Sequence, residues 1–193
     1  MYRIVVIFLS IFITSCATVA PVVNPNDSIS IYGVSSLPPQ NGDWSVLTVS
    51  GYQMSLTKNG SIKNESLAVN VSIYQLPVFP TDEGFLKHVI QGRAAEPDIG
   101  RFEVLTNSES IATLNGANCV VYHSISKDKR AQIQGGDTAV MLLENRGYNC
   151  KHPENVTVGV IIEYSLRHFP ESEYLSFEKN ANEFASNIKF TDF

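Results

Sequence analysis

The chain has 193 residues, with 14 lysines and arginines against 19 aspartates and glutamates, so its formal net charge at pH 7 is −5. A mildly acidic chain does not offer the basic surface that nucleic acids require, and anionic lipids do not attract it. We therefore expect no nucleic-acid partner. The length suits one domain with an extension and is sufficient to bury a substantial core.

The first residues follow the pattern of an export signal. Arg3 is the only charged residue before an apolar run over residues 4–13, which Ser10 alone interrupts. A helix of this length rises about 15 Å, half of a hydrocarbon core of roughly 30 Å. The run is therefore too short to span a bilayer comfortably and has the length of a signal-peptide core.

The apolar run ends in Ile13-Thr14-Ser15-Cys16, which resembles the lipobox of bacterial lipoproteins. The resemblance implies that residues 1–15 are removed as a signal peptide and that Cys16 is lipidated. In that family an aspartate after the cysteine favours the inner membrane, so Ala17 implies attachment to the outer membrane, facing the periplasm. The alternatives are an ordinary secretory signal with an incidental cysteine, or a short uncleaved anchor.

Residues 16–43 are predicted to be the lipidated cysteine and a flexible tether. Four prolines and little hydrophobic periodicity argue against packed structure between residues 17 and 43. As polyproline II this segment would extend roughly 80 Å from the membrane. Only residues 28–32 alternate in polarity, which makes them a candidate edge strand. We expect a single folded domain over residues 44–193.

The first half of this domain carries strand patterns followed by a helix pattern. Strands are expected over residues 44–50, 52–57 and 67–74, the last with a clean period of two. Thr81 is a candidate N-cap, and the acidic residues that follow it suit a helix N-terminus. Pro97 prevents the helix from continuing.

The second half carries further strand patterns and a second helix. Strands are expected over residues 102–105, 110–114, 119–126, 139–144 and 156–166, with a polar hairpin tip at residues 127–130 and turns at residues 115–116 and 135–137. The last helix is predicted to begin at Pro170. Its apolar stripe consists of Tyr174, Phe177, Ala181, Phe184, Ala185 and Ile188. Residues 188–190 are expected to leave the helix and join a sheet edge.

This order of elements predicts an α+β fold, a mostly antiparallel sheet with two covering helices. The order resembles the PsbP-like group of α/β/α sandwiches, which includes small bacterial lipoproteins. The resemblance implies a layered sandwich and a role in binding or assembly.

Two cysteines remain once Cys16 is assigned to lipid. An even number of cysteines in an exported protein favours a disulfide, here Cys119–Cys150, closing a loop of about thirty residues. The chain-entropy model gives such a bridge roughly 3 to 4 kcal/mol of stabilisation. The alternatives are two free thiols, or a metal site that adds His152, although this is no known ligand spacing.

Residues 146–153 form the most distinctive stretch of the chain. It contains Arg146, Tyr148, Lys151 and His152, and a bridged Cys150 would hold it in place. We predict a recognition loop there, because rigid loops with exposed aromatic and basic side chains are typical binding surfaces. The alternative is a simple connection with solvated polar residues.

The sequence shows no motif that would place a reaction. The four histidines form no HExxH pair, and no serine lies in a GxSxG elbow. We therefore predict no catalytic residues, no cofactor and no metal site, and a non-enzymatic binding or assembly module of the cell envelope with an envelope protein as partner. The alternatives are an enzyme with a dispersed site, and a carrier of a small apolar ligand.

Overall fold

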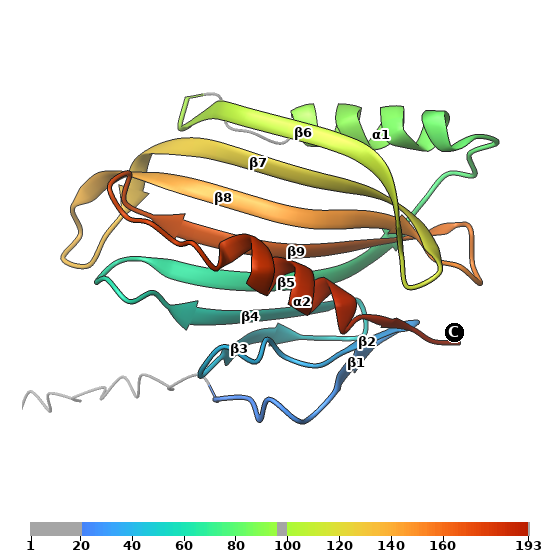
Figure 1. The fold of residues 1–193 in the computed structure, drawn as a ribbon, viewed down its shortest axis with the longest axis horizontal. Helices are drawn as coiled ribbons and strands as arrows, with labels where there is room; N and C mark the ends of the chain where they lie inside the picture. The colour runs from blue at the N-terminus through green and yellow to red at the C-terminus, as the bar shows by residue number, and fades with distance from the viewer. Residues whose placement is uncertain (1–20, 96–99, 193) are drawn as a thin grey trace, which may run out of the picture.

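The computed structural model describes residues 21–95 and 100–192. Within these residues the chain forms ten strands and two helices (Figure 1). The predicted signal peptide and the lipidated Cys16 lie outside the described residues. None of the described helices is long and apolar enough to cross a bilayer.

A large antiparallel sheet forms the body of the protein. Its strands lie in the order β3-β4-β5-β9-β8-β7-β6. The strands of this sheet are β3 (Ser45–Val49), β4 (Gln53–Asn59), β5 (Ser66–Gln75), β6 (Phe102–Leu114), β7 (Ala117–Gln132), β8 (Thr138–Lys151) and β9 (Val158–His168). Strands β6 to β9 form a meander. Strand β9 also pairs with β5, which joins the meander to strands β3 to β5. The antiparallel pairing confirms the predicted fold class.

A small sheet is made by β1 (Ile29–Ile31), β2 (Val34–Ser36) and β10 (Lys189–Phe190). The predicted flexible tether is therefore wrong for residues 21–43, which are part of the folded domain. Val34 is only 1% exposed, and the Val23 N–H donates to the Trp44 carbonyl at 2.8 Å. Strands β1 and β2 form a hairpin, which is held in place because β10 pairs with β2. The expectation that residues 188–190 leave the last helix and join a sheet edge is confirmed.

Helix α1 (Asp82–Ala95) connects β5 to β6. The Gly84 N–H donates to Thr81 Oγ1 at 3.1 Å, as predicted for an N-cap. Figure 1 shows α1 along the β6 side of the large sheet, and α2 (Phe177–Ser186) across the opposite face.

Helix α2 begins at Phe177, so the predicted start at Pro170 is wrong. The buried Glu65 carboxylate holds the segment before the helix in a non-helical path. It accepts a hydrogen bond from the Phe169 N–H at 3.0 Å and others from the Ser172 and Tyr174 hydroxyls. Burial opposes ionisation of Glu65, but these hydrogen bonds outweigh it and lower the pKa of Glu65.

The predicted hairpin tip at residues 127–130 is also wrong, because these residues lie inside β7. Asp128 is fully buried and accepts two hydrogen bonds from Arg101, at 2.9 and 2.7 Å. These hydrogen bonds lower the pKa of Asp128 against the opposing effect of burial. The hairpin turns later, where Gly135 and Gly136 have φ values of 103° and 85°.

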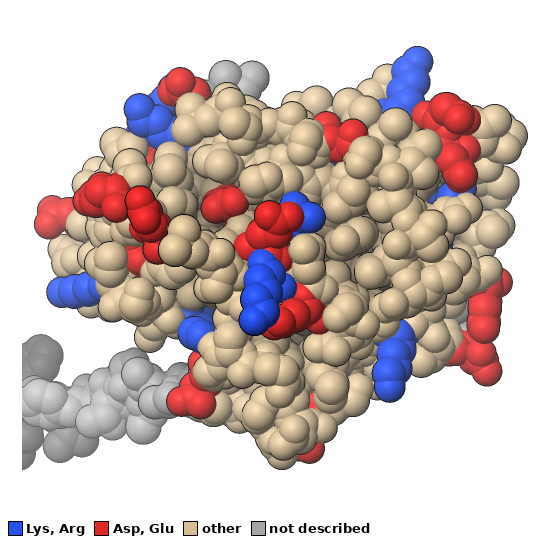
Figure 2. Space-filling view, in the orientation of Figure 1, with Lys and Arg blue, Asp and Glu red and all other residues tan. Residues whose placement is uncertain are grey.

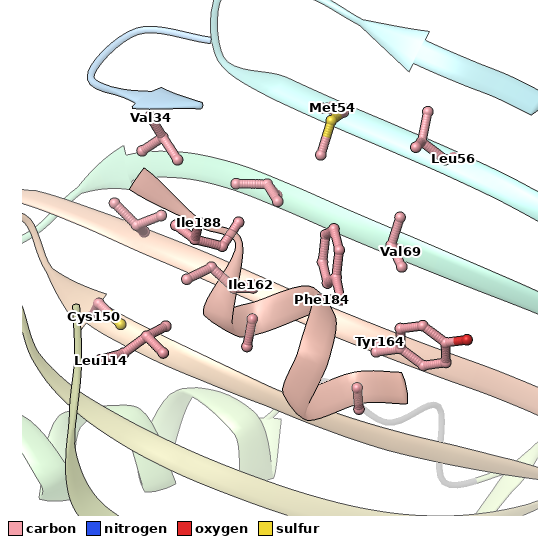
Figure 3. Packing of buried hydrophobic residues seen from close by; sticks show 14 of the residues in the cluster. Val34, Met54, Leu56, Val69, Leu114, Cys150, Ile162, Tyr164, Phe184 and Ile188 are labelled. Carbon is pink, nitrogen blue, oxygen red and sulfur yellow. The ribbon is translucent and has the colours of Figure 1, made fainter. Parts of the chain in front are cut away.

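The main core lies between the large sheet, α2 and the small sheet. Figure 3 shows Phe184 and Ile188 pointing toward Ile162, Tyr164 and Val69 of the sheet. Strand residues alternate between the two faces of a sheet, so this core uses every second residue of each strand. The intervening residues face the side of α1, where a second, smaller cluster forms around Phe85.

Candidate functional site

The predicted recognition residues do not form a loop. Arg146, Tyr148 and Lys151 lie within β8, and His152 follows directly after it. The alternation of the strand separates them: Tyr148 packs against the core beneath α2, whereas Lys151 contacts Phe85 of α1. The predicted loop is therefore wrong, and these residues do not share one face of the sheet.

Three of these side chains instead attach other elements to the sheet. Arg146 donates from Nε to Asn182 Oδ1 at 2.9 Å and pairs with Glu178 at 3.2 Å, both in α2. Lys151 Nζ lies 2.5 Å from Asp82 at the start of α1. The buried His152 places Nε2 2.8 Å from the Gly33 carbonyl, between β1 and β2.

The surface over α2 shows charges of both signs. In Figure 2 a mixed cluster of acidic and basic side chains lies at the centre of this face. The ion pair Arg146–Glu178, at 3.2 Å, connects β8 to α2. The ion pair Lys179–Glu183, at 3.7 Å, lies within α2. Such pairs neutralise each other, so this face presents no field of one sign to a partner.

The predicted disulfide is confirmed. Cys119 and Cys150 lie directly opposite each other on β7 and β8 and form the bridge. Both are buried in the main core. The bridge excludes the free-thiol and metal alternatives, because neither sulfur retains a thiolate. Among the described residues, no group of three or more histidine, cysteine or acidic side chains is placed to hold a metal ion.

A groove with a mixed polar and apolar lining lies on the other face of the large sheet, beside α1. It consists of two cavities of about 470 and 380 Å³ that share Arg93 of α1 and Glu163 of β9. Further side chains of the larger cavity come from α1 and from three other strands, β6, β7 and β8: Ala94, Phe102, Asn107, Ser124 and Asn145. Further side chains of the smaller cavity include Asn70, Tyr74, His88, Tyr122 and Asn149. Amide, hydroxyl and aromatic groups therefore line the groove.

Two tyrosines lie flat against the sheet in this groove. Tyr122 faces Gly147 across the β7–β8 pair, and Tyr74 faces Gly159 across the β5–β9 pair. A Cβ on either glycine would collide with the ring opposite it. The glycines are thus required because the rings occupy the space that a side chain would need.

Hydrogen bonds hold both tyrosines in place. The Tyr122 hydroxyl donates to Glu163 Oε2 at 2.8 Å, and the Tyr74 hydroxyl donates to Asn149 Oδ1 at 2.7 Å. Burial raises the pKa of Tyr74, so this hydroxyl stays protonated and continues to donate. Glu163 also accepts from Ser165 at 3.1 Å.

Arg93 lines both cavities. Its guanidinium carbon lies 3.5 Å from the centre of the Tyr122 ring, and Nη2 donates to Ser124 Oγ at 3.2 Å. Nε lies 3.6 Å from Glu109 Oε1, an ion pair without a hydrogen bond. Stacking and pairing on several sides hold the guanidinium in one position.

Two buried polar atoms of the groove lack a hydrogen-bond partner among the described residues. They are the donor Arg93 Nε and the acceptor Asn145 Oδ1, and both residues line the larger cavity. Buried polar atoms in proteins are nearly always satisfied, by protein, water or ligand. These atoms add a donor and an acceptor to the interior of the groove wall, and neither is exposed in the groove itself.

The sequence analysis did not identify Arg93, Tyr122, Asn145 or Glu163 as site residues. A signal was present in the glycines at 147 and 159, since glycine inside a strand marks the close approach of another group. The pairing of the strands was needed to show which tyrosine covers which glycine.

No protein-family model and no curated protein matches this chain. Solved structures with a similar chain path include a Bacteroides thetaiotaomicron protein, with 13% identity and a TM-score of 0.43. The match covers 88% of this chain and 50% of that one, so this chain spans half the length of that protein.

Two further similar structures are a mutant of the protein Mog1 and the cyanobacterial PsbP of Synechocystis. The Mog1 match has 12% identity and a TM-score of 0.44, covering 86% of this chain and 96% of that one. The PsbP match has 15% identity and a TM-score of 0.38, covering 82% and 87%. At these values the likenesses bring neither a site residue nor a function to this chain.

Proposed function

We propose that this protein is a lipid-anchored, non-enzymatic binding or assembly module of the cell envelope. In this proposal Cys16 carries the lipid, and the domain faces the periplasm from the outer membrane. The observation that carries the binding role is the groove itself, with cavities of about 470 and 380 Å³ that share Arg93 and Glu163.

The anchoring part of the proposal rests on the lipobox pattern at Ile13–Cys16. The Cys119–Cys150 bridge supports export, because disulfides persist in oxidising compartments such as the periplasm. The acyl chains on Cys16 would supply the membrane affinity that the acidic chain does not.

In this proposal the link between the lipid and the folded domain is short. The Pro21 carbonyl already accepts a hydrogen bond from the Val46 N–H at 3.0 Å. Pro21 lies five positions after Cys16, and an extended chain covers at most about 3.6 Å per residue, so the link spans at most roughly 18 Å. We therefore propose a module that works next to the bilayer.

The anchor is tested with the Cys16→Ser variant in the bacterial envelope. We expect the variant to lose its acyl mass and to leave the membrane fraction. Unchanged membrane fractionation would overturn the anchoring proposal.

The binding role is tested by placing a photocrosslinking phenylalanine at single positions of the lipidated protein. Gly92 lines the groove, whereas Leu175 is 95% exposed just before α2 and serves as the control position. We expect a discrete crosslinked product from position 92 that position 175 does not give. No product, or the same products from both positions, would count against the groove as the binding surface.

The enzyme alternative also rests on an observation in the groove. His88 and Glu163 line the same cavity, and two titratable groups in one polar cleft can exchange protons with a substrate. An enzyme would chemically change the molecule bound in the groove, and Glu163→Gln would prevent that change. Mass spectrometry of a bound molecule recovered after incubation separates this alternative from simple binding.

A further inference from the structure

We infer that the groove beside α1 binds a neutral saccharide. This inference rests on the proposed binding role and names the chemical class of ligand for that same site. It follows from the size of the groove, its charge and the kinds of atoms that it presents.

The groove has the size of a small-molecule site. Its two cavities, of about 470 and 380 Å³, both fall in the range of roughly 300 to 1,000 Å³ that is usual for ligand pockets. Since Arg93 and Glu163 line both, a ligand longer than one ring can occupy the two cavities together.

The charges of the groove favour a neutral ligand. The guanidinium of Arg93 is already paired with Glu109 at 3.6 Å, and Glu163 adds a second carboxylate to the lining. A phosphate or carboxylate ligand would lie beside Glu163, and Glu109 already offsets the charge of Arg93. An anionic ligand is therefore disfavoured.

The polar atoms of the groove match hydroxyl groups. Arg93 Nε is an unmatched donor and Asn145 Oδ1 an unmatched acceptor among the described residues. A hydroxyl both donates and accepts, so sugar hydroxyls suit a lining that contains both kinds of polar atom. Four asparagines line the two cavities: Asn70, Asn107, Asn145 and Asn149. The Asn149 amide oxygen and the Asn107 amide nitrogen are already hydrogen-bonded, at 2.7 and 2.6 Å, so Asn149 has its amide nitrogen and Asn107 its amide oxygen left for hydroxyls.

The location of the groove favours a saccharide over an extended peptide. Extended peptides are commonly held by main-chain hydrogen bonds at a sheet edge. The floor of this groove is a sheet face, where β7, β8 and β9 already pair with one another. It offers side-chain amides and hydroxyls, together with the apolar surfaces of Phe102 and Ile161.

Gly92 permits a variant that blocks the groove without disturbing the fold. It lies in α1 and lines the smaller cavity, and a Cβ there meets no heavy atom within 4 Å. Gly92→Phe therefore projects a ring into open space. Gln91→Phe is the matched control, because Gln91 is the exposed neighbour on the same helix.

The test uses the lipidated protein in nanodiscs and saturation-transfer NMR with three neutral probes: maltohexaose, cellohexaose and the hexamer of N-acetylglucosamine. We expect at least one probe to receive saturation from the natural protein and from Gln91→Phe, and to bind at least tenfold more weakly to Gly92→Phe. Asn145→Ala, which removes the unmatched acceptor without filling the groove, should weaken the same probe severalfold.

Absence of transfer to all three probes would overturn the inference, as would equal binding to Gly92→Phe and the natural protein. The inference would also be overturned if a neutral Gly-Ser-Asn peptide bound while none of the probe sugars did, and if Gly92→Phe abolished that peptide binding. A protein crosslinked from position 92 in such a case would leave the binding role standing and reject only the saccharide.

Discussion

The same strands build both faces of the large sheet. Successive residues of a strand point to opposite faces, and the residues of the two faces have different roles. In β9, Ile162 and Tyr164 enter the core beneath α2, whereas Ile161 and Glu163 line the groove beside α1. The α2 face also receives the small sheet and the Cys119–Cys150 bridge. The α1 face retains cavities of about 470 and 380 Å³.

This difference separates stability from binding within one sheet. The covered face excludes water with apolar side chains, which contributes most of the free energy of folding. The half-covered face carries polar side chains whose positions are fixed by that stable framework. Changes on the first face should therefore alter the unfolding free energy, and changes in the groove should alter binding.

The largest expected effect is the removal of an aromatic side chain beneath α2. Phe184 is 1% exposed, so Phe184→Ala should lower the unfolding free energy by about 3–5 kcal/mol through lost burial and the cavity that remains. Leu175→Ala is the control, because Leu175 is 95% exposed and should change stability by less than about 0.5 kcal/mol. Urea unfolding measures both, and similar losses would contradict the comparison.

The disulfide should have the next largest effect. Replacing Cys119 and Cys150 together by alanine should lower the unfolding free energy by roughly 3 to 4 kcal/mol, since the bridge closes a loop with a sequence separation of 31. The natural protein in a reducing agent should unfold at the same urea midpoint as this variant. A midpoint that does not respond to the reducing agent would show that the bridge does not stabilise the α2 face.

Glu65 should make the approach to α2 sensitive to acid. The pKa of Glu65 is lowered in the folded protein. Its contribution to the unfolding free energy is therefore fully present above the pKa of the unfolded state, near the usual 4.5. This contribution is lost as the pH falls through the pKa of the folded state. Glu65→Gln should lower the unfolding free energy by about 1.5–3 kcal/mol at pH 7, since it weakens hydrogen bonds to a charged group. The difference from the natural protein should shrink at pH 3.

Glu173→Gln is the control for that measurement, because Glu173 is exposed on the same segment. Urea unfolding at both pH values should show no comparable change for this variant. A gap between Glu65→Gln and the natural protein that is the same at pH 3 and pH 7 would exclude Glu65 as the acid-sensitive group.

The smallest effect is expected in the groove wall. Gly92→Ala should raise the unfolding free energy by about 0.5–1 kcal/mol, because alanine favours the helix and the added Cβ meets no neighbour. Gly147→Ala should have the opposite sign, since its Cβ would collide with the Tyr122 ring and the Ile162 carbonyl. Thermal unfolding of the two variants distinguishes the open space beside Gly92 from the occupied space beside Gly147. A higher unfolding free energy for both variants would contradict this difference.

Local patterns predicted much of the fold, and contacts between distant residues account for the errors. The alternation over residues 67–74, the Thr81 cap and the last apolar stripe each depend on neighbours within a few positions. The errors at residues 21–43 and 127–130 arise from distant partners: β10 pairs with β2, and Arg101 pairs with the buried Asp128. The late start of α2 likewise depends on Glu65, 104 residues before Phe169.

The sequence by itself determined which residues of each strand share a face and that Cys119 and Cys150 were available for a bridge. These properties follow from the period of two along a strand and from the order of residues. Only the tertiary structure decided which face α2 would cover, and that Arg93, Tyr122 and Glu163 would meet beside α1. Those three residues come from different elements, and the pairing of strands far apart in the chain brings them together.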